Sequence, residues 1–101
     1  MNSLTSLAKM EDEVATISAV YLMKLCSLDL TNDSHALVKS YLYVRRVEEA
    51  LSSLSEQCRE LITNDFINPS SPKWWKSSYS SEYYLKLRYR AVDSFLMHFY
   101  D

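Results

Sequence analysis

The chain has 101 residues, enough for one domain with a modest core, and 48% of them are hydrophobic while 24% are charged. This balance excludes a largely disordered chain. Glycine is absent and proline occurs only at Pro69 and Pro72. Because tight β-turns depend on glycine, the composition excludes a β-rich fold and predicts an all-α protein, a small helical bundle forming a single domain over residues 1–101.

The formal net charge of −2 is unevenly distributed along the chain. Residues 1–65 carry six basic and ten acidic side chains, whereas the stretch 73–90 carries five basic side chains and one acidic one. A basic segment near the C-terminal end favours an anionic partner.

No part of the sequence has the pattern of a metal site, a cofactor site or a membrane segment. Cys26 and Cys58 lie far apart in helical patterns without histidine at ligand spacing, so we expect buried free thiols and neither metal nor cofactor. No apolar run reaches the ~18 residues of a membrane span, and the N-terminus has no apolar signal core. We therefore expect a cytoplasmic protein without membrane contact.

The first half of the chain, residues 1–46, is predicted to form two helices. Apolar residues recur three and four positions apart over 4–28 and again from His35 to about Leu51. The turn between them has Asp33 or Ser34 as the cap of the second helix. The apolar stripe of the first helix indicates packing inside a bundle or against a second copy of the chain.

The second half, residues 47–101, is predicted to contain three further helices. Ser53 and Glu56 fit a capping box for a helix that reaches about Phe66. A short helix over 72–78 is expected after it, with Ser71 as cap and Pro72 at the first helical position. The final helix, capped by Ser80 or Ser81, extends to about Phe99.

The final helix has one apolar and one polar arc at ~100° per residue. The arc expected to be buried contains Tyr84, Leu85, Leu87, Ala91, Val92, Phe95, Leu96 and Phe99. The outer arc contains Glu82, Tyr83, Lys86, Arg90, Asp93, Ser94 and Met97. Arg88 falls inside the apolar arc, so it must either reach solvent or pair with a carboxylate.

The outer arc of this helix has residue types suited to a DNA groove. Recognition helices contact base edges through their N-terminal residues, and cations there bind guanine or phosphate. The residues predicted to bind DNA are Ser81 and Glu82 at the helix start, Tyr83, Lys86 and Arg90 in the groove, and Lys73 and Lys76 on phosphate. The competing interpretation is a solvated helix face with at least one tryptophan in the core.

Two segments of the second half resemble the fourth region of bacterial sigma factors. The stretch 47–62 (VEEALSSLSEQCRELI) resembles the opening helix of that region, and 91–96 (AVDSFL) resembles the end of its recognition helix. The spacing of seven residues within 74–91 more closely resembles that of small sigma-like regulators of Gram-positive phages and mobile elements, the late-gene activators that include RinA and ArpU. Those residues are Trp74, Trp75, Tyr79, Ser80, Tyr84, Leu87 and Ala91.

The resemblance covers residues 47–97 and implies a C-terminal helix-turn-helix that binds double-stranded promoter DNA and can contact RNA polymerase. The first half matches no family, and three roles remain open for it: forming a homodimer, contacting polymerase or completing the core.

Two other functional classes compete with a DNA-binding transcriptional regulator. One is a protein-interaction module, an anti-repressor, anti-sigma or polymerase-binding factor that uses the Trp/Tyr-rich surface of residues 74–84. The other is an enzyme, which the sequence disfavours because it has no phosphate-binding loop, metal-ligand spacing or paired nucleophile and base. We expect a non-enzymatic protein.

Overall fold

The structure is a computed structural model that describes residues 3–30 and 32–101. Its described residues form four α-helices and one π-helical turn, and they contain no strand. The elements are α1 Ser3–Leu30, α2 Ser34–Ser52, α3 Glu56–Ile62, η1 Thr63–Ile67 and α4 Ser81–Tyr100. The predicted all-α bundle is therefore confirmed.

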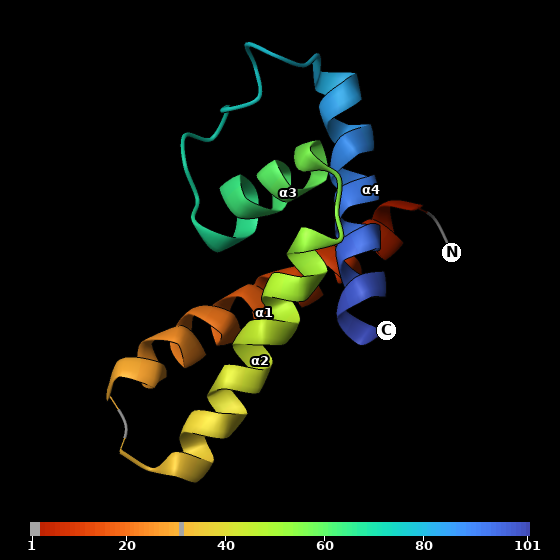
Figure 1. Ribbon diagram of the computed structural model, residues 1–101. Coiled ribbons are helices and arrows are strands. Elements are labelled where there is room, and N and C mark those ends of the chain that lie inside the picture. The colour runs from red at the N-terminus through yellow and green to blue at the C-terminus, as the bar shows by residue number, and fades with distance from the viewer. Residues whose placement is uncertain (1–2, 31) are drawn as a thin grey trace.

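Helices α1 and α2 form a long antiparallel hairpin (Figure 1). The Asp33 side chain accepts a hydrogen bond from the His35 N–H at 3.0 Å and caps α2, as the sequence predicts. Val14 and Ile17 of α1 are buried together with Val44 of α2 in one apolar cluster. The predicted three- and four-residue spacing thus places these side chains on the facing sides of the two helices.

Helix α3 begins at a different cap from the predicted one. Ser55, not Ser53, accepts a hydrogen bond from the Cys58 N–H, so α3 starts at Glu56. The Ser53 N–H and hydroxyl both bond to the carbonyl of Glu49, which makes Ser53 the end of α2. The expectation of a capping box at Ser53 is therefore wrong because that residue is used to close the preceding helix.

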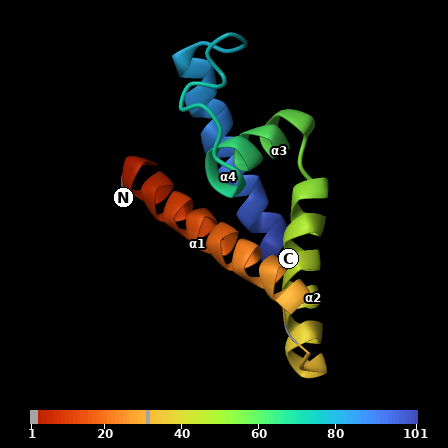
Figure 2. The same cartoon turned by 90° about the vertical axis from the view of Figure 1, so that its left-hand side faces the viewer.

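Helix α4 contacts α1, α2 and α3 and joins both halves of the chain into one core (Figure 2). The Ser80 side chain accepts from the Tyr83 N–H at 3.1 Å and caps it, as predicted. Phe95 and Val92 of α4 are fully buried beside Leu61 of α3 and Val47 of α2. Helix α2 continues without a break across residue 46, where the sequence analysis divided the chain into two halves. One hydrophobic cluster contains residues of both halves.

The predicted short helix over 72–78 does not form. This stretch is a series of turns, with the Trp74 N–H bonded to the Ser71 carbonyl at 3.1 Å and the Ser78 N–H bonded to the Trp75 carbonyl at 3.0 Å. Residues 68–80 therefore form an irregular connection between η1 and α4. The specific helix-turn-helix geometry that the sequence resemblance implies stays a prediction.

Candidate nucleic-acid interface

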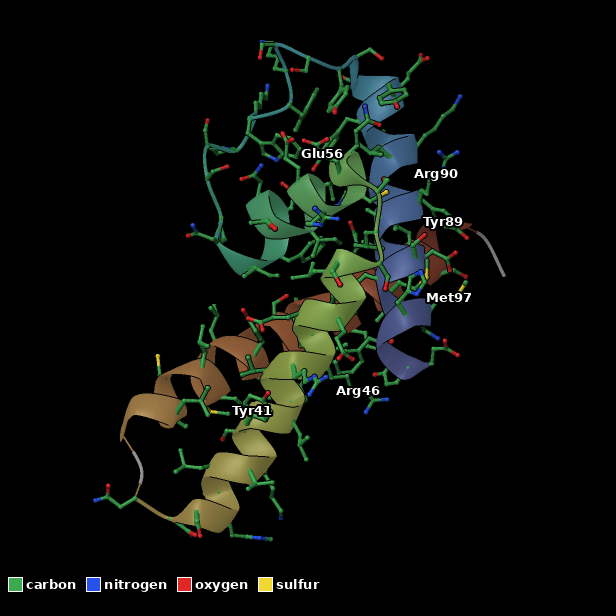
Figure 3. The ribbon with its side chains drawn as sticks, viewed as in Figure 1. Tyr41, Arg46, Glu56, Tyr89, Arg90 and Met97 are labelled. Atoms are coloured by element: carbon green, nitrogen blue, oxygen red, sulfur yellow. The ribbon has the colours of Figure 1, made fainter. Side chains whose placement is uncertain are left out.

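The outer face of α4 combines two cations with two tyrosines. Lys86 and Arg90 are exposed, and Tyr83 and Tyr89 are each 44% exposed. The positions 83, 86 and 90 lie on one side of the helix because they are three and four residues apart. Figure 3 shows Arg90 and Tyr89 projecting from the same side of α4.

Tyr83 is held in place by two neighbours. Its hydroxyl donates to Gln57 Oε1 of α3 at 3.2 Å, and its ring lies 5.1 Å from the ring of Tyr79. Ser81 and Glu82 form the exposed first turn beside it, where an acidic side chain interacts favourably with the positive end of the helix dipole. The first turn of α4 is thus capped by Ser80 and is joined to α3 by the hydrogen bond between Tyr83 and Gln57.

Arg90 differs from the other arginines in having no intramolecular partner among the described residues. The other four are held within the chain: Arg45 by Glu49, Arg46 by the Phe99 carbonyl, Arg59 by the carbonyls of Leu51, Ser52 and Leu54, and Arg88 by Glu11 and Asp65. Lys86 likewise has neither an ion pair nor a hydrogen bond in the described part of the chain. Both cations are therefore free to bind an external anion.

A partly buried polar cluster anchors α4 from the opposite side. Asp65 Oδ2 accepts hydrogen bonds from Arg88 Nη1 at 2.7 Å and from the Tyr84 hydroxyl at 2.5 Å, and Asp65 Oδ1 accepts from Trp74 Nε1 at 2.7 Å. Arg88 Nε also donates to Glu11 of α1. The cluster joins α1, η1, the 68–80 connection and α4, and it confirms that Arg88 pairs with carboxylates.

The π-helical form of η1 places two residues of this cluster. The wider turn of Thr63–Ile67 carries both Asp65 and Phe66, and the Arg88 guanidinium lies 4.8 Å from the Phe66 ring centre. Burial, followed by the hydrogen bond to Asp65, raises the pKa of Tyr84 to about 12. Tyr84 therefore stays neutral and keeps donating to Asp65 across the physiological pH range.

Both tryptophans make contacts with other side chains of the protein. Trp75 stacks on Tyr84 with ring centres 4.3 Å apart, and Trp74 meets the same ring edge-on at 6.4 Å. Trp74 is partly buried and packs against the edge of the hydrophobic cluster, so the expectation of a core tryptophan is met only in this coarser form. These contacts draw the 68–80 connection onto Tyr84.

The seven residues predicted to bind DNA fall into two groups. Ser81, Glu82, Tyr83, Lys86 and Arg90 lie on α4, while Lys73 and Lys76 are exposed in the turns of the 68–80 connection. In Figure 3, Arg90 projects from the side of α4 away from that connection. The two lysines of that connection therefore do not continue the row formed by Lys86 and Arg90.

Two further residues of the α4 face were missed by the sequence reasoning. Leu85 was placed in the buried arc but is 57% exposed, because it lies at the edge of that arc in the first turns, beyond the reach of α1 and α2. Tyr89 was assigned to neither arc, although its position between Lys86 and Arg90 is a signal that could have identified it. Both enlarge the apolar part of the exposed face.

The described residues contain no group of three or more histidine, cysteine, aspartate or glutamate side chains that could hold a metal ion. Within the same residues, no helix has the length and apolar character needed to cross a membrane. Comparisons of the chain with protein-family models, with curated proteins and with solved structures find no match.

Proposed function

We propose that this protein is a sequence-specific, sigma-like transcriptional regulator of phage or mobile-element origin that binds double-stranded DNA through the outer face of α4. The observation that carries the proposal is that Arg90 and the neighbouring Lys86 have no partner in the described part of the chain, whereas the four other arginines all have internal partners. An exposed cation without an internal partner reaches an external anion at no cost in broken contacts.

The residues of this face match the chemistry of a DNA groove. Arginine and lysine bind guanine O6 and N7, and each good bidentate pair contributes about 1–3 kcal/mol of discrimination between bases. Tyr83 and Tyr89 can pack against sugars or thymine methyl groups, and Glu82 can accept from the amino group of cytosine. Lys73, Lys76 and the Ser81 hydroxyl would contact the phosphate backbone, which fixes the register of the helix.

Binding to a labelled duplex tests the proposal with two charge-matched double variants. Lys86→Ala with Arg90→Ala is expected to weaken binding at least tenfold and to reduce the slope of log K against log salt by about 2. Lys39→Ala with Arg45→Ala removes the same charge from exposed positions of α2 and is expected to leave the affinity nearly unchanged. Equal losses in the two variants would contradict a specific role for α4.

A second candidate function is protein docking by the same face, with RNA polymerase as the partner. Exposure of Leu85 and Tyr89 favours it, because protein interfaces are enriched in tyrosine and in apolar side chains surrounded by polar ones. The competing docking surface, residues 74–84, has less support because Trp75 already stacks on Tyr84 and Trp74 meets the same ring edge-on. If this face docks on RNA polymerase, the wild-type protein should capture polymerase and should not bind duplex DNA. The double variant Leu85→Ala, Tyr89→Ala should then lose polymerase capture.

A further inference from the structure

Among the helices that the structure describes, none covers the distal half of the α1–α2 hairpin. Helix α4 ends where its Phe99 carbonyl accepts from Arg46 at 2.6 Å and its Tyr100 hydroxyl donates to Glu13 at 3.0 Å. Beyond these points α1 continues to Leu30 and α2 begins at Ser34. Figure 2 shows this end of the hairpin extending away from α3 and α4.

The uncovered half is apolar but exposed. Residues 20–28 and 36–44 contain only two charged side chains, Lys24 and Lys39. Large apolar side chains are exposed in both segments, and they are Leu22, Met23, Leu25, Val38, Tyr41 and Leu42. Helices that carry apolar residues on most of their circumference are usually covered on more than one side.

One flank of the hairpin forms a continuous apolar surface, here called the hairpin face. At ~100° per residue, Leu22, Leu25 and Cys26 fall within about a third of the circumference of α1. Leu37 and Tyr41 lie one turn apart on α2. They are on the flank marked by the hydrogen bond of 3.2 Å from the Tyr21 hydroxyl of α1 to Glu48 of α2, because Glu48 is only about 20° round α2 from Tyr41. In Figure 3, Tyr41 lies on the side of α2 away from Arg46.

The opposite flank carries Lys24 and Lys39, the two charged side chains of segments 20–28 and 36–44. Arg46 and Lys39 line a shallow pocket of about 300 Å³ there, together with Leu42 and Tyr43. Lys24 lies about 200° round α1 from Leu22, as Lys39 does round α2 from Tyr41. The two lysines therefore point away from the hairpin face.

We propose that the hairpin face binds the hairpin face of a second copy of this chain, forming a two-fold symmetric dimer with four helices at its centre. A two-fold contact brings each residue close to its own counterpart, so a charged surface would repel itself. The hairpin face avoids this repulsion because its five residues are uncharged. Two antiparallel helices stacked on two others also form a common bundle arrangement.

The available area places the dimer among the small interfaces, which are typical of weak association. The five residues of the hairpin face and the neighbouring Val38 offer roughly 400 Å² of apolar surface per copy, so two copies with their polar rim bury about 1,000–1,200 Å². This is the lower limit for a specific interface. We therefore expect a dissociation constant of about 1–100 μM.

Sedimentation equilibrium of the full chain without DNA tests this proposal independently of the proposed function. Wild type is expected to show a monomer–dimer equilibrium in the micromolar range, and Leu22→Glu is expected to weaken dimerisation at least tenfold. Leu42→Glu is the matched control, because Leu42 is 58% exposed but lies on the opposite flank. A wild-type chain that stays monomeric at several hundred micromolar, or equal effects of the two substitutions, would overturn the proposal.

The Cys26 thiol gives a second test that needs no variant. Cys26 is exposed on the hairpin face, so the expected burial of this thiol is wrong, whereas Cys58 is buried as expected. A maleimide reagent therefore reports on Cys26 alone. The rate constant for its modification is expected to fall as the protein concentration passes through the dimerisation range. A rate constant that is independent of protein concentration would contradict the proposed interface, even if Leu22→Glu fails to fold.

Discussion

Replacing Arg88 by methionine removes the cation at the centre of the cluster that joins four segments of the chain. Methionine keeps much of the aliphatic volume, so the change mainly removes the charge and its hydrogen bonds. The Arg88 side chain is 23% exposed and that of Asp65 only 10%. Asp65 and Glu11 would lose their cation, and the guanidinium contact with the Phe66 ring would also be lost.

The expected loss of stability can be bounded from this geometry. Removing one partner of a fully buried ion pair costs about 3–5 kcal/mol. Asp65 keeps the donors of Tyr84 and Trp74, and Glu11 is one-quarter exposed, so we expect Arg88→Met to lower the free energy of unfolding by about 2–3 kcal/mol. That is a large share of the ~5–15 kcal/mol typical of a small domain.

Urea unfolding at pH 7, followed by far-ultraviolet circular dichroism, measures this loss. Arg45→Met is the matched control, because the Arg45–Glu49 pair has side chains 61% and 65% exposed and its removal should leave the unfolding midpoint unchanged. Asp65→Asn combined with Arg88→Met should cost less than the sum of the single changes. If Arg88→Met shifts the midpoint no more than Arg45→Met, the cluster does not anchor α4 and the reasoning is refuted.

Two further predictions concern buried polar groups. The Ser18 hydroxyl is buried and has no hydrogen-bond partner among the described residues, so Ser18→Ala should raise the free energy of unfolding by about 0.5–1.5 kcal/mol; a destabilised variant in thermal melts would contradict this. Because the pKa of Tyr84 is raised from 10.0 to about 12, the folded state holds its proton more tightly than the unfolded chain. The contribution of the Tyr84 hydroxyl to the free energy of unfolding is therefore fully present below pH 10 and is lost as the pH rises towards 12. Urea unfolding should show a smaller loss across pH 10–12 for Tyr84→Phe than for wild type, and identical losses would exclude the proposed burial.

The helices and their caps could be predicted largely from local sequence. The regular apolar spacing of α1, α2 and α4 depends only on residues within each helix, and Asp33 and Ser80 cap their helices through bonds to N–H groups two or three residues away. The pairing of Arg88 with a carboxylate also followed from its place in the apolar arc. The identity of its partners did not, because Glu11 and Asp65 are 77 and 23 residues away in the chain.

The failures come from tertiary contacts that override local patterns. The Ser71–Pro72 pair favours the start of a helix. Instead, Trp74 and Trp75 both contact the Tyr84 ring, and the backbone of residues 72–78 forms turns that allow these two contacts. The start of α3 was misplaced because Ser53 and Ser55 both have capping chemistry, and only the end of α2 decides between them. Leu85 was assigned to the buried arc of the final helix because helical spacing gives only the direction of a side chain. It does not show how far along that helix the neighbouring helices extend.

The central claim is that the outer face of α4 reads double-stranded DNA, and selection from a pool of random duplexes tests it most directly. Wild-type protein is expected to enrich a defined sequence over successive rounds, with guanine at the positions contacted by Lys86 and Arg90. The Lys86→Ala, Arg90→Ala double variant should lose that preference while the Lys39→Ala, Arg45→Ala double variant keeps it. A wild-type selection that ends without an enriched sequence would contradict the claim.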